Sequence, residues 1–423
     1  MSIGIGTETK IRLFYGWWIV AAGLLVIAYG TGASGFITRN LFSPIGSNAN
    51  KVATALGIYS GVMTIASLAI GPLIDRFGPR KLMLIGIPAA SGAILGLSFA
   101  NSLLYIFLGI LAIGMSAGFL LPVQTATANW FMKRRSTALA VVCAASALGG
   151  PVVNRLGNQV MHQFSLQNTL LGLGIAMLAI GIPLAFVIKH KPEQHGYMPD
   201  GMVPIIKETI QPIIKKETHF VEVNFSLRQA LRTKAFWILV VAISLANGSG
   251  TLVESRRSIY MVEQGLHYRP ANFSELASLM GLVWILLFGF LGDKFSKRHL
   301  LAIAIALQSI SVVVLINVGN LTQLYFYMLV HGFGSGIAPL ILAMRADYFG
   351  RKAFATITVV MGFIGGIVSV GFVFLNQFIL GPTGNYQVVF LLSMLIGLVA
   401  AATVIFAEPP ELPHHKLPDH KTA

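Results

Sequence analysis

Long apolar stretches separated by short polar turns run through almost the whole chain. Each stretch is long enough to cross the ~30 Å hydrocarbon core of a bilayer as a helix. The pattern therefore predicts an all-α membrane protein with twelve transmembrane helices, at residues 14–38, 52–74, 82–99, 103–127, 137–161, 169–188, 235–259, 273–292, 300–318, 321–344, 354–380 and 386–407.

One polar stretch interrupts the series between the sixth and seventh helices. Residues 189–234 are mixed in charge and contain Pro192, Pro199, Pro204 and Pro212, which is typical of a linker. We expect an N-terminal six-helix half at residues 1–190, a cytoplasmic linker at 191–233, and a C-terminal six-helix half with a short tail at 234–423.

Several motifs recur at a constant step of 218 residues. Arg39 returns as Arg257, and Asp75 in Gly-x-x-x-Asp returns as Asp293 in the same pattern. Trp130-Phe131 returns as Tyr348-Phe349. A single offset for separate motifs indicates two halves of like fold that point the same way, with a site between them.

Composition supports the membrane assignment and narrows the function. The chain is 55% hydrophobic and 11% charged, whereas about a quarter of the residues in a soluble protein are charged. Its net charge of +15 comes from basic residues in short loops, which favours a topological role over nucleic-acid binding. The distribution predicts a multi-pass protein of the cell inner membrane with both termini cytoplasmic.

The residues that catalysis, metal binding or nucleotide binding would need are missing from the sequence. Cys143 is the only cysteine, so neither a disulfide framework nor a cysteine metal site is expected. The sequence has no nucleotide-binding loop and no nucleophile–base pair at workable spacing. We predict that the protein is not an enzyme and uses no cofactor.

The segment Gly71-Pro-Leu-Ile-Asp75-Arg76-Phe-Gly78-Pro-Arg80-Lys81, with its copy at 289–298, resembles the loop 2–3 signature of the major facilitator superfamily. Tyr15-Gly-Trp-Trp18, Asn129 to Arg135 and Arg345 to Lys352 resemble the bacterial monocarboxylate and oxalate:formate carriers. The resemblance implies transport of small carboxylates, with helices 1, 4, 7 and 10 lining the cavity. It also implies gating by Asp75, Arg76, Arg80, Asp293 and Arg345.

Ionisable residues inside a span are costly and usually functional. Arg39, Arg155, Arg256 and Arg257 lie toward the ends of spans opposite the linker, and we expect them to bind a negatively charged substrate. Adjacent residues lie about 100° apart on a helix, so only one of Arg256 and Arg257 is expected to face the cavity. Snorkelling to the interface is the alternative for each arginine.

Glu254 is the only carboxylate well inside a predicted span. We predict that it couples proton and anion movement, and a local ion pair with a neighbouring arginine is the alternative. Uncharged groups that would orient the substrate, or else form interhelical hydrogen bonds, are Tyr29, Gln124, Asn154, Asn247 and His331.

Two features depart from the resembling carriers. Those carriers place an arginine on helix 8, whereas residues 281–289 here are uncharged. Asn154-Arg155 also stands where a glycine pair is expected on helix 5. The surplus of other arginines suits a di- or polycarboxylate better than a simple monocarboxylate.

The sequence thus predicts a secondary active transporter of organic anions, from mono- to polycarboxylates, that works by alternating access. Symport with protons and antiport by exchange both remain open. A membrane sensor on a transporter scaffold and a carrier of a citrate-based siderophore are the alternatives. A monomer in the lipid bilayer, with a small organic anion and a proton as its partners, is expected.

Overall fold

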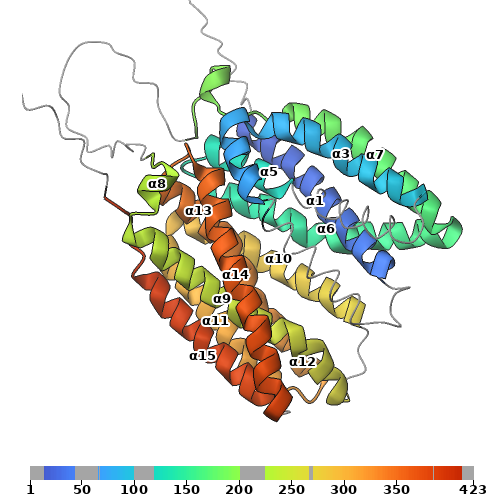
Figure 1. Ribbon diagram of the computed structural model, residues 1–423, viewed down its shortest axis with the longest axis vertical. Coiled ribbons are helices and arrows are strands. Elements are labelled where there is room, and N and C mark those ends of the chain that lie inside the picture. The colour runs from blue at the N-terminus through green and yellow to red at the C-terminus, as the bar shows by residue number, and fades with distance from the viewer. Residues whose placement is uncertain are drawn as a thin grey trace, which may run out of the picture.

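The computed structural model describes residues 14–42, 65, 67–99, 119–200, 224–265, 270–383 and 385–411. These residues form helices arranged in two groups (Figure 1). The N-terminal group contains the helical residues 67–77 together with α1 (Tyr15–Phe42), α3 (Pro79–Phe99), α5 (Leu120–Trp130), α6 (Arg135–Gln163) and α7 (Leu166–Val187).

The C-terminal group begins after two short helices of the linker region, η1 (Glu193–His195) and α8 (Leu227–Ala230). It contains α9 (Lys234–Glu263), α10 (Pro270–Lys294), α11 (Lys297–Ile316), α12 (Leu321–His331), η2 (Gly332–Gly336), α13 (Ile337–Phe349), α14 (Phe354–Thr383) and α15 (Tyr386–Ile405). The linker residues 188–200 and α8 lie beside one set of helix ends. We call this part of the molecule the linker end.

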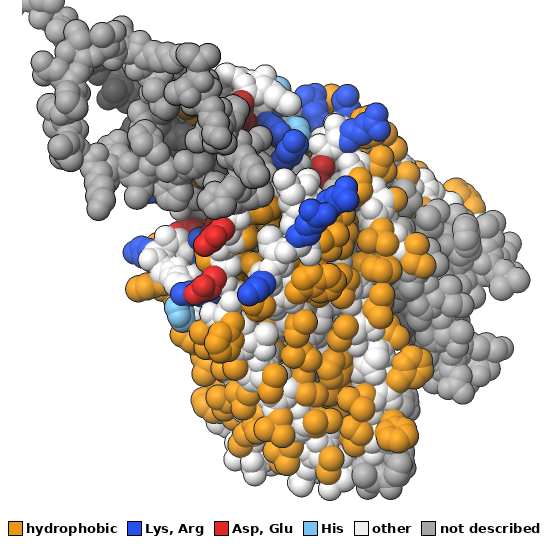
Figure 2. All heavy atoms as spheres, turned by 60° about the vertical axis from the view of Figure 1, so that its left-hand side comes forward, with side chains coloured by type: hydrophobic (Ala, Val, Ile, Leu, Met, Phe, Trp, Pro, Cys, Tyr) orange, Lys and Arg blue, Asp and Glu red, His pale blue; other side chains and the backbone are white. Residues whose placement is uncertain are grey.

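Ten stretches of the described chain are long and apolar enough to cross a membrane, and each overlaps a predicted span. The other two predicted spans, 52–74 and 103–127, lie partly outside the described residues, although 67–77 and 120–130 are helical. Figure 2 shows hydrophobic side chains over the lower part of the visible face, with charged side chains gathered near the linker end. This division suits a protein that crosses a bilayer.

Polar side chains cap the N-termini of several helices at the end opposite the linker. Ser165 accepts a hydrogen bond from the backbone N–H of Asn168 at the start of α7, at 3.2 Å. Asn320 accepts one from Gln323 N–H at the start of α12, at 2.9 Å. Such caps satisfy N–H groups that a helix leaves unpaired in its first turn, so the tight turns between spans are encoded locally.

The span predicted at 321–344 corresponds to one apolar stretch, Leu321–Phe349, which the structure divides into α12 and α13. The five residues between them, Gly332–Gly336, form a 3₁₀ turn. Side chains from other helices occupy this turn: Trp284 of α10 stacks on Phe333 and donates its indole N–H to the Leu329 carbonyl at 2.8 Å. Gln308 of α11 lies where a Cβ on Gly334 would be.

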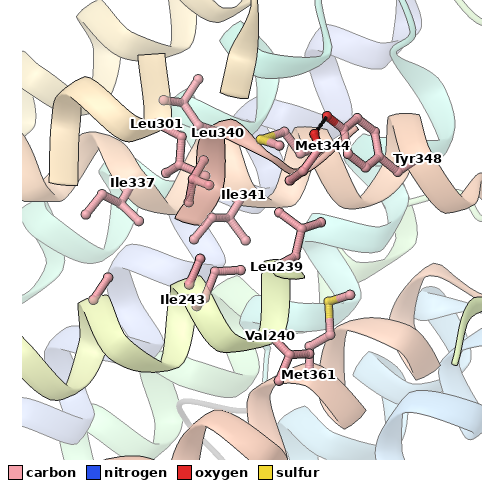
Figure 3. Close-up of a cluster of buried hydrophobic side chains, with 14 of the residues drawn as sticks. Leu239, Val240, Ile243, Leu301, Ile337, Leu340, Ile341, Met344, Tyr348 and Met361 are labelled. Atoms are coloured by element: carbon pink, nitrogen blue, oxygen red, sulfur yellow. Dashed lines mark hydrogen bonds between the residues drawn. The ribbon is translucent and has the colours of Figure 1, made fainter. Parts of the chain in front are cut away.

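Each helix group has its own hydrophobic core. The C-terminal core gathers Leu239 and Ile243 of α9, Leu301 of α11 and Met361 of α14 around one face of α13 (Figure 3). That face carries Ile337, Leu340, Ile341, Met344 and Tyr348. Tyr348 also donates its hydroxyl to the Ala407 carbonyl at 2.7 Å, which holds α13 against the segment that follows α15.

Candidate functional site

Two aspartates join the helix groups at the linker end in the same way. Asp75 accepts hydrogen bonds from the backbone N–H groups of Ala355 and Thr356, at 3.1 and 2.8 Å, in the first turn of α14. Asp293 accepts them from Ser136 and Thr137, at 2.8 and 3.0 Å, in the first turn of α6. A carboxylate stabilises a helix N-terminus because it satisfies unpaired N–H groups and opposes the helix dipole.

Ion pairs reinforce this junction. The buried Arg135 at the start of α6 pairs with Asp347 of α13, which also pairs with Lys297 of α11 at 2.9 Å. Arg351, in the turn after α13, donates to the Asn129 carbonyl at 2.7 Å and pairs with Glu193 at 2.8 Å. The Arg135–Asp347 pair and the hydrogen bond from Arg351 to Asn129 cross from one helix group to the other.

An apolar cluster lies beside these polar contacts and is called the cross-group cluster here. It combines buried side chains of both groups, so the halves touch directly at this level. Its members are Ala128 of α5, Leu139, Ala140, Cys143 and Ala144 of α6, Ile285 of α10, Leu342, Ala343 and Ala346 of α13, and Phe354 of α14. The linker end is therefore closed.

The two ends of the linker bind equivalent turns. Asp200 accepts hydrogen bonds from the backbone N–H groups of Met132, Lys133 and Arg134, after α5. The Asn224 side chain accepts them from Arg351 and Lys352, after α13, at 3.2 and 3.1 Å. Each end of the linker thus accepts hydrogen bonds from the backbone N–H groups of one inter-helix turn.

The linker end also contains a histidine with a perturbed pKa. Burial lowers the pKa of His190 to about 4, and the neighbouring Lys191 acts in the same direction. The His190 ring lies 3.2 Å from where a Cβ on Gly78 would be, and Gly78 has a φ of +87° that favours glycine. This histidine is held neutral by its surroundings.

The predicted gating arginines Arg76 and Arg80 occupy the same end. Arg76 lies 5.2 Å from the centroid of the Phe77 ring, and Arg80 lies 4.9 Å from that of Phe186. Both positions suit a basic loop that contacts aromatic side chains. The third predicted gating cation, Arg345, is buried within α13.

Arg39 and Arg155 lie at the end opposite the linker and are exposed. A close crossing of α1 and α6 positions them, because a Cβ on Gly32 would lie 2.4 Å from the Gly149 carbonyl oxygen. One turn beyond this crossing, the buried Asn154 lies beside Gly35, and its amide oxygen has no hydrogen-bond partner. The crossing thus sets Asn154 of α6 against α1, one turn before Arg39.

Arg256 and Arg257 are half-buried on α9 and lie near different helices. Arg257 lies within electrostatic reach of Tyr327 and His331 on α12. Arg256 lies within such reach of Tyr386 on α15. The exposed Glu254 lies one turn before Arg257 on the same helix and is also within electrostatic reach of Tyr327.

The remaining predicted site residues differ in their surroundings. Tyr29 donates its hydroxyl to the Leu173 carbonyl of α7 at 2.6 Å, and Gln124 is buried beside Cys143. Asn247 is exposed on α9. His331, at the end of α12, stacks on Tyr327 and has its Nδ1 3.1 Å from the Ser311 hydroxyl.

Sequence reasoning missed four residues that hold the linker end closed, namely Arg135, Glu193, Asp347 and Arg351. They lie in basic loops and in the linker. Many Lys and Arg residues there indicate the membrane orientation, so the sequence does not show which charged residue pairs with which. The 218-residue step contained the one usable signal, because it places Lys133 opposite Arg351 in equivalent turns.

Comparison with known proteins decides the family. The model of the Major Facilitator Superfamily matches residues 13–287 and 274–422, which is nearly the whole chain. The chain belongs to the major facilitator superfamily. The motif at Asp75 and its copy at Asp293 thus stand in a chain of this superfamily.

Relatives of this superfamily member include transporters of organic acids. The 4-hydroxybenzoate transporter PcaK of Acinetobacter baylyi is 23% identical over 92% of this chain and 90% of its own. The oxalate:formate antiporter of Oxalobacter formigenes is 21% identical over 86% and 84%. The uncharacterized MFS-type transporter YhjX of Escherichia coli is 24% identical, over 68% of each chain.

Solved structures confirm the superfamily fold. The human organic anion transporter MFSD10 superposes with a TM-score of 0.69 at 14% identity, covering 92% of this chain and 99% of its own. The transporter FucP in its outward conformation superposes with a TM-score of 0.62 at 15% identity, covering 93% and 100%. Membership of this superfamily makes the chain a multi-pass membrane transporter rather than an enzyme.

Proposed function

We propose that the protein carries small organic anions across the bacterial inner membrane by alternating access. The observation that carries this proposal is the contrast between the two ends of the molecule. The linker end is closed by Asp75, Asp293 and the Arg135–Asp347 pair, whereas Arg39 and Arg155 are exposed at the opposite end. Guanidinium groups at an open entrance attract anions and match carboxylates in geometry.

The orientation follows from the same contrast. Lys and Arg concentrate in the loops of the linker end, which supports a cytoplasmic position for that end and for both termini. The anion then enters from the periplasmic side in the state described here. The names of two relatives, a 4-hydroxybenzoate transporter and an oxalate:formate antiporter, support carboxylates as the substrate class.

Counterflow in proteoliposomes tests this function directly. Purified protein loaded with unlabelled oxalate or 4-hydroxybenzoate is expected to accumulate the labelled compound, whereas a sensor would bind it without accumulation. Arg39→Gln and Arg257→Gln are expected to weaken uptake, while Arg232→Gln, at an exposed position on the linker side, serves as the control. No counterflow or binding with any carboxylate of a broad panel would contradict the proposal.

Glu254 is the proposed coupling acid. It is exposed on α9 and lies one turn from Arg257, so its charge state changes the field in which an anion binds. Glu254→Gln is expected to abolish proton-driven accumulation and to preserve counterflow, since exchange needs no net proton movement. Uptake by Glu254→Gln that keeps the pH dependence of the unaltered carrier would rule out this role.

A further inference from the structure

Arg345 is buried in the membrane-spanning part of the molecule without a counter-charge. It is 8% exposed, and its Nε is fully buried with no hydrogen-bond partner. No described carboxylate lies within ion-pair distance of it, since the ion pairs found use Arg135, Lys297, Arg298 and Arg351. A buried charge without a partner is strongly unfavourable, so binding of an anion beside Arg345 would be favourable, and the described carboxylates do not provide that anion.

The neighbouring Arg351 shows that burial alone does not leave an arginine unpaired at this end. It has the same 8% exposure and lies six residues further along the chain. Its guanidinium nevertheless pairs with Glu193 at 2.8 Å and donates to the Asn129 carbonyl at 2.7 Å. The fold therefore provides partners for a structural arginine at this end and leaves Arg345 without them.

The helix geometry of α13 indicates where Arg345 points. The face with Ile337, Ile341 and Met344 packs into the C-terminal core (Figure 3). The face with Leu342 and Ala346 packs into the cross-group cluster. At about 100° per residue, Arg345 lies between those two faces. It also lies about 160° around the helix from Asp347, whose partners belong to α6 and α11.

Besides α6, α9, α10 and α11, the helices that contact α13 include α5 and α14, which also contact each other. Arg345 therefore points toward a junction where three helices from both groups meet. Each helix presents a polar residue there, one turn from a member of the cross-group cluster. Gln124 of α5 precedes Ala128 by four residues, and Thr358 of α14 follows Phe354 by four.

These polar groups lie at similar depth. Arg345 and Thr358 are each about 6 Å from the linker-side end of their helix, and Gln124 is about 9 Å from that of α5, at 1.5 Å per residue. The Thr358 hydroxyl is buried and has no hydrogen-bond partner, like the Nε of Arg345. Two donors thus stand without acceptors beside the closed end.

We propose that Arg345, with Thr358 and Gln124 beside it, forms a carboxylate-binding subsite at the closed end of the transport path. The planar guanidinium binds a carboxylate of the substrate through two parallel N–H···O bonds, and Thr358 and Gln124 donate to the remaining lone pairs. This inference rests on the proposed anion transport. It assigns Arg345 to substrate binding, in place of the gating role that its sequence position suggests.

The subsite also explains why α10, the eighth predicted span, needs no binding arginine of its own. The family resemblance implies a binding arginine on α10, yet residues 281–289 contain none. Arg345 places a cation beside the same cross-group cluster from α13. Arg39 lies near the end of α1 opposite the linker, and this 28-residue helix is about 42 Å long at 1.5 Å per residue. Arg39 therefore attracts the anion at the entrance and does not share a small carboxylate with Arg345.

The test uses the full-length carrier in nanodiscs, with oxalate, 4-hydroxybenzoate and inorganic sulfate as probes. Thermal unfolding is measured with and without each probe for the unaltered carrier, Arg345→Met and Arg351→Met. Arg345→Met is expected to raise the unfolding temperature without probe, because it removes an uncompensated buried charge, and to bind the carboxylate at least about tenfold more weakly. Arg351→Met is expected to lower the unfolding temperature and to keep the carboxylate-induced shift.

Each other outcome overturns a defined part of the inference. If Arg345→Met binds the carboxylate as tightly as the unaltered carrier, or is less stable than it without probe, the subsite is refuted while anion transport stands. If sulfate stabilises the unaltered carrier as much as either carboxylate does, the subsite is not selective for carboxylates and this assignment is wrong. If no probe stabilises the unaltered carrier or undergoes counterflow, the anion-transport proposal fails, and the subsite with it.

Discussion

Asp75 and Asp293 make equivalent contacts across the junction between the two helix groups. Each carboxylate accepts the N–H groups of two consecutive residues in the first turn of a helix that belongs to the other group. Opening the linker end must break both contacts, so these two residues set part of the free-energy difference between the closed and open states of that end.

Asp75→Asn and Asp293→Asn are therefore expected to open the linker end more often. Loss of an N-cap costs about 0.5–2 kcal/mol, which corresponds to an increase in the open population of about 2- to 30-fold. The native Cys143 reports this opening, because it is the only cysteine and is buried in the cross-group cluster. Its alkylation rate by a maleimide is the measurement.

Asp200→Asn is the matched control for that experiment. Asp200 also accepts backbone N–H groups at the linker end, but from Met132 to Arg134 within the N-terminal group. This variant is expected to leave the alkylation rate of Cys143 unchanged. A rise as large as that of Asp75→Asn would show that the rate reports general loosening instead of separation of the groups.

Asp347→Asn is expected to destabilise the closed state more than either cap variant does. Asp347 neutralises both Arg135 and Lys297, and Arg135 is almost fully buried. Breaking a buried pair costs about 3–5 kcal/mol, and the partial exposure of Asp347 brings the expected loss toward about 2 kcal/mol. Thermal unfolding of Asp347→Asn, Arg135→Gln and the double variant measures the coupling, and strictly additive losses would contradict a direct interaction.

Gly149→Ala is expected to separate α1 from α6 and to lower stability. A Cβ at this position would lie 2.2 Å from the Ala28 carbonyl oxygen and 2.5 Å from the Thr31 hydroxyl. Overpacking of this kind costs about 1–3 kcal/mol. Gly172→Ala on α7 is the control, because its Cβ would meet nothing within 4 Å and alanine favours a helix by up to about 1 kcal/mol.

His190 predicts a pH dependence of stability. Its folded-state pKa of about 4 lies below the ordinary value of 6.5, so the unfolded chain binds a proton first as the pH falls. Stability from this residue is present above pH 6.5 and decreases as the pH falls from about 6.5 toward about 4. Unfolding temperatures across this range should fall less steeply for His190→Gln, and parallel curves would contradict the prediction.

The sequence predicted the fold well because membrane spans are encoded locally. A helix in lipid must satisfy every backbone group within itself, so length and apolarity suffice to locate most spans. The break at Gly332–Gly336 escaped prediction because glycines are tolerated in membrane helices. What fixes the 3₁₀ turn is Trp284 and Gln308, which approach from other helices.

The contacts at the linker end were unpredictable for a related reason. Arg135 and Asp347 are separated by 212 residues and meet only when the two groups assemble. Sequence alone identified Arg256 and Arg257 as pointing differently, but it could not show that one lies near α12 and the other near α15. The burial of Arg345 without a partner is likewise a property of packing and not of its local motif.

The 3₁₀ turn between α12 and α13 has a mechanical consequence. A residue in a 3₁₀ helix turns 120° and rises about 2.0 Å, against 100° and 1.5 Å in an α-helix. Conversion of all five residues to α-helix would shorten the segment by about 2.5 Å and rotate α13 by about 100° relative to α12. A screw displacement of this size would swing the guanidinium of Arg345 through more than a quarter of a revolution without unwinding either helix.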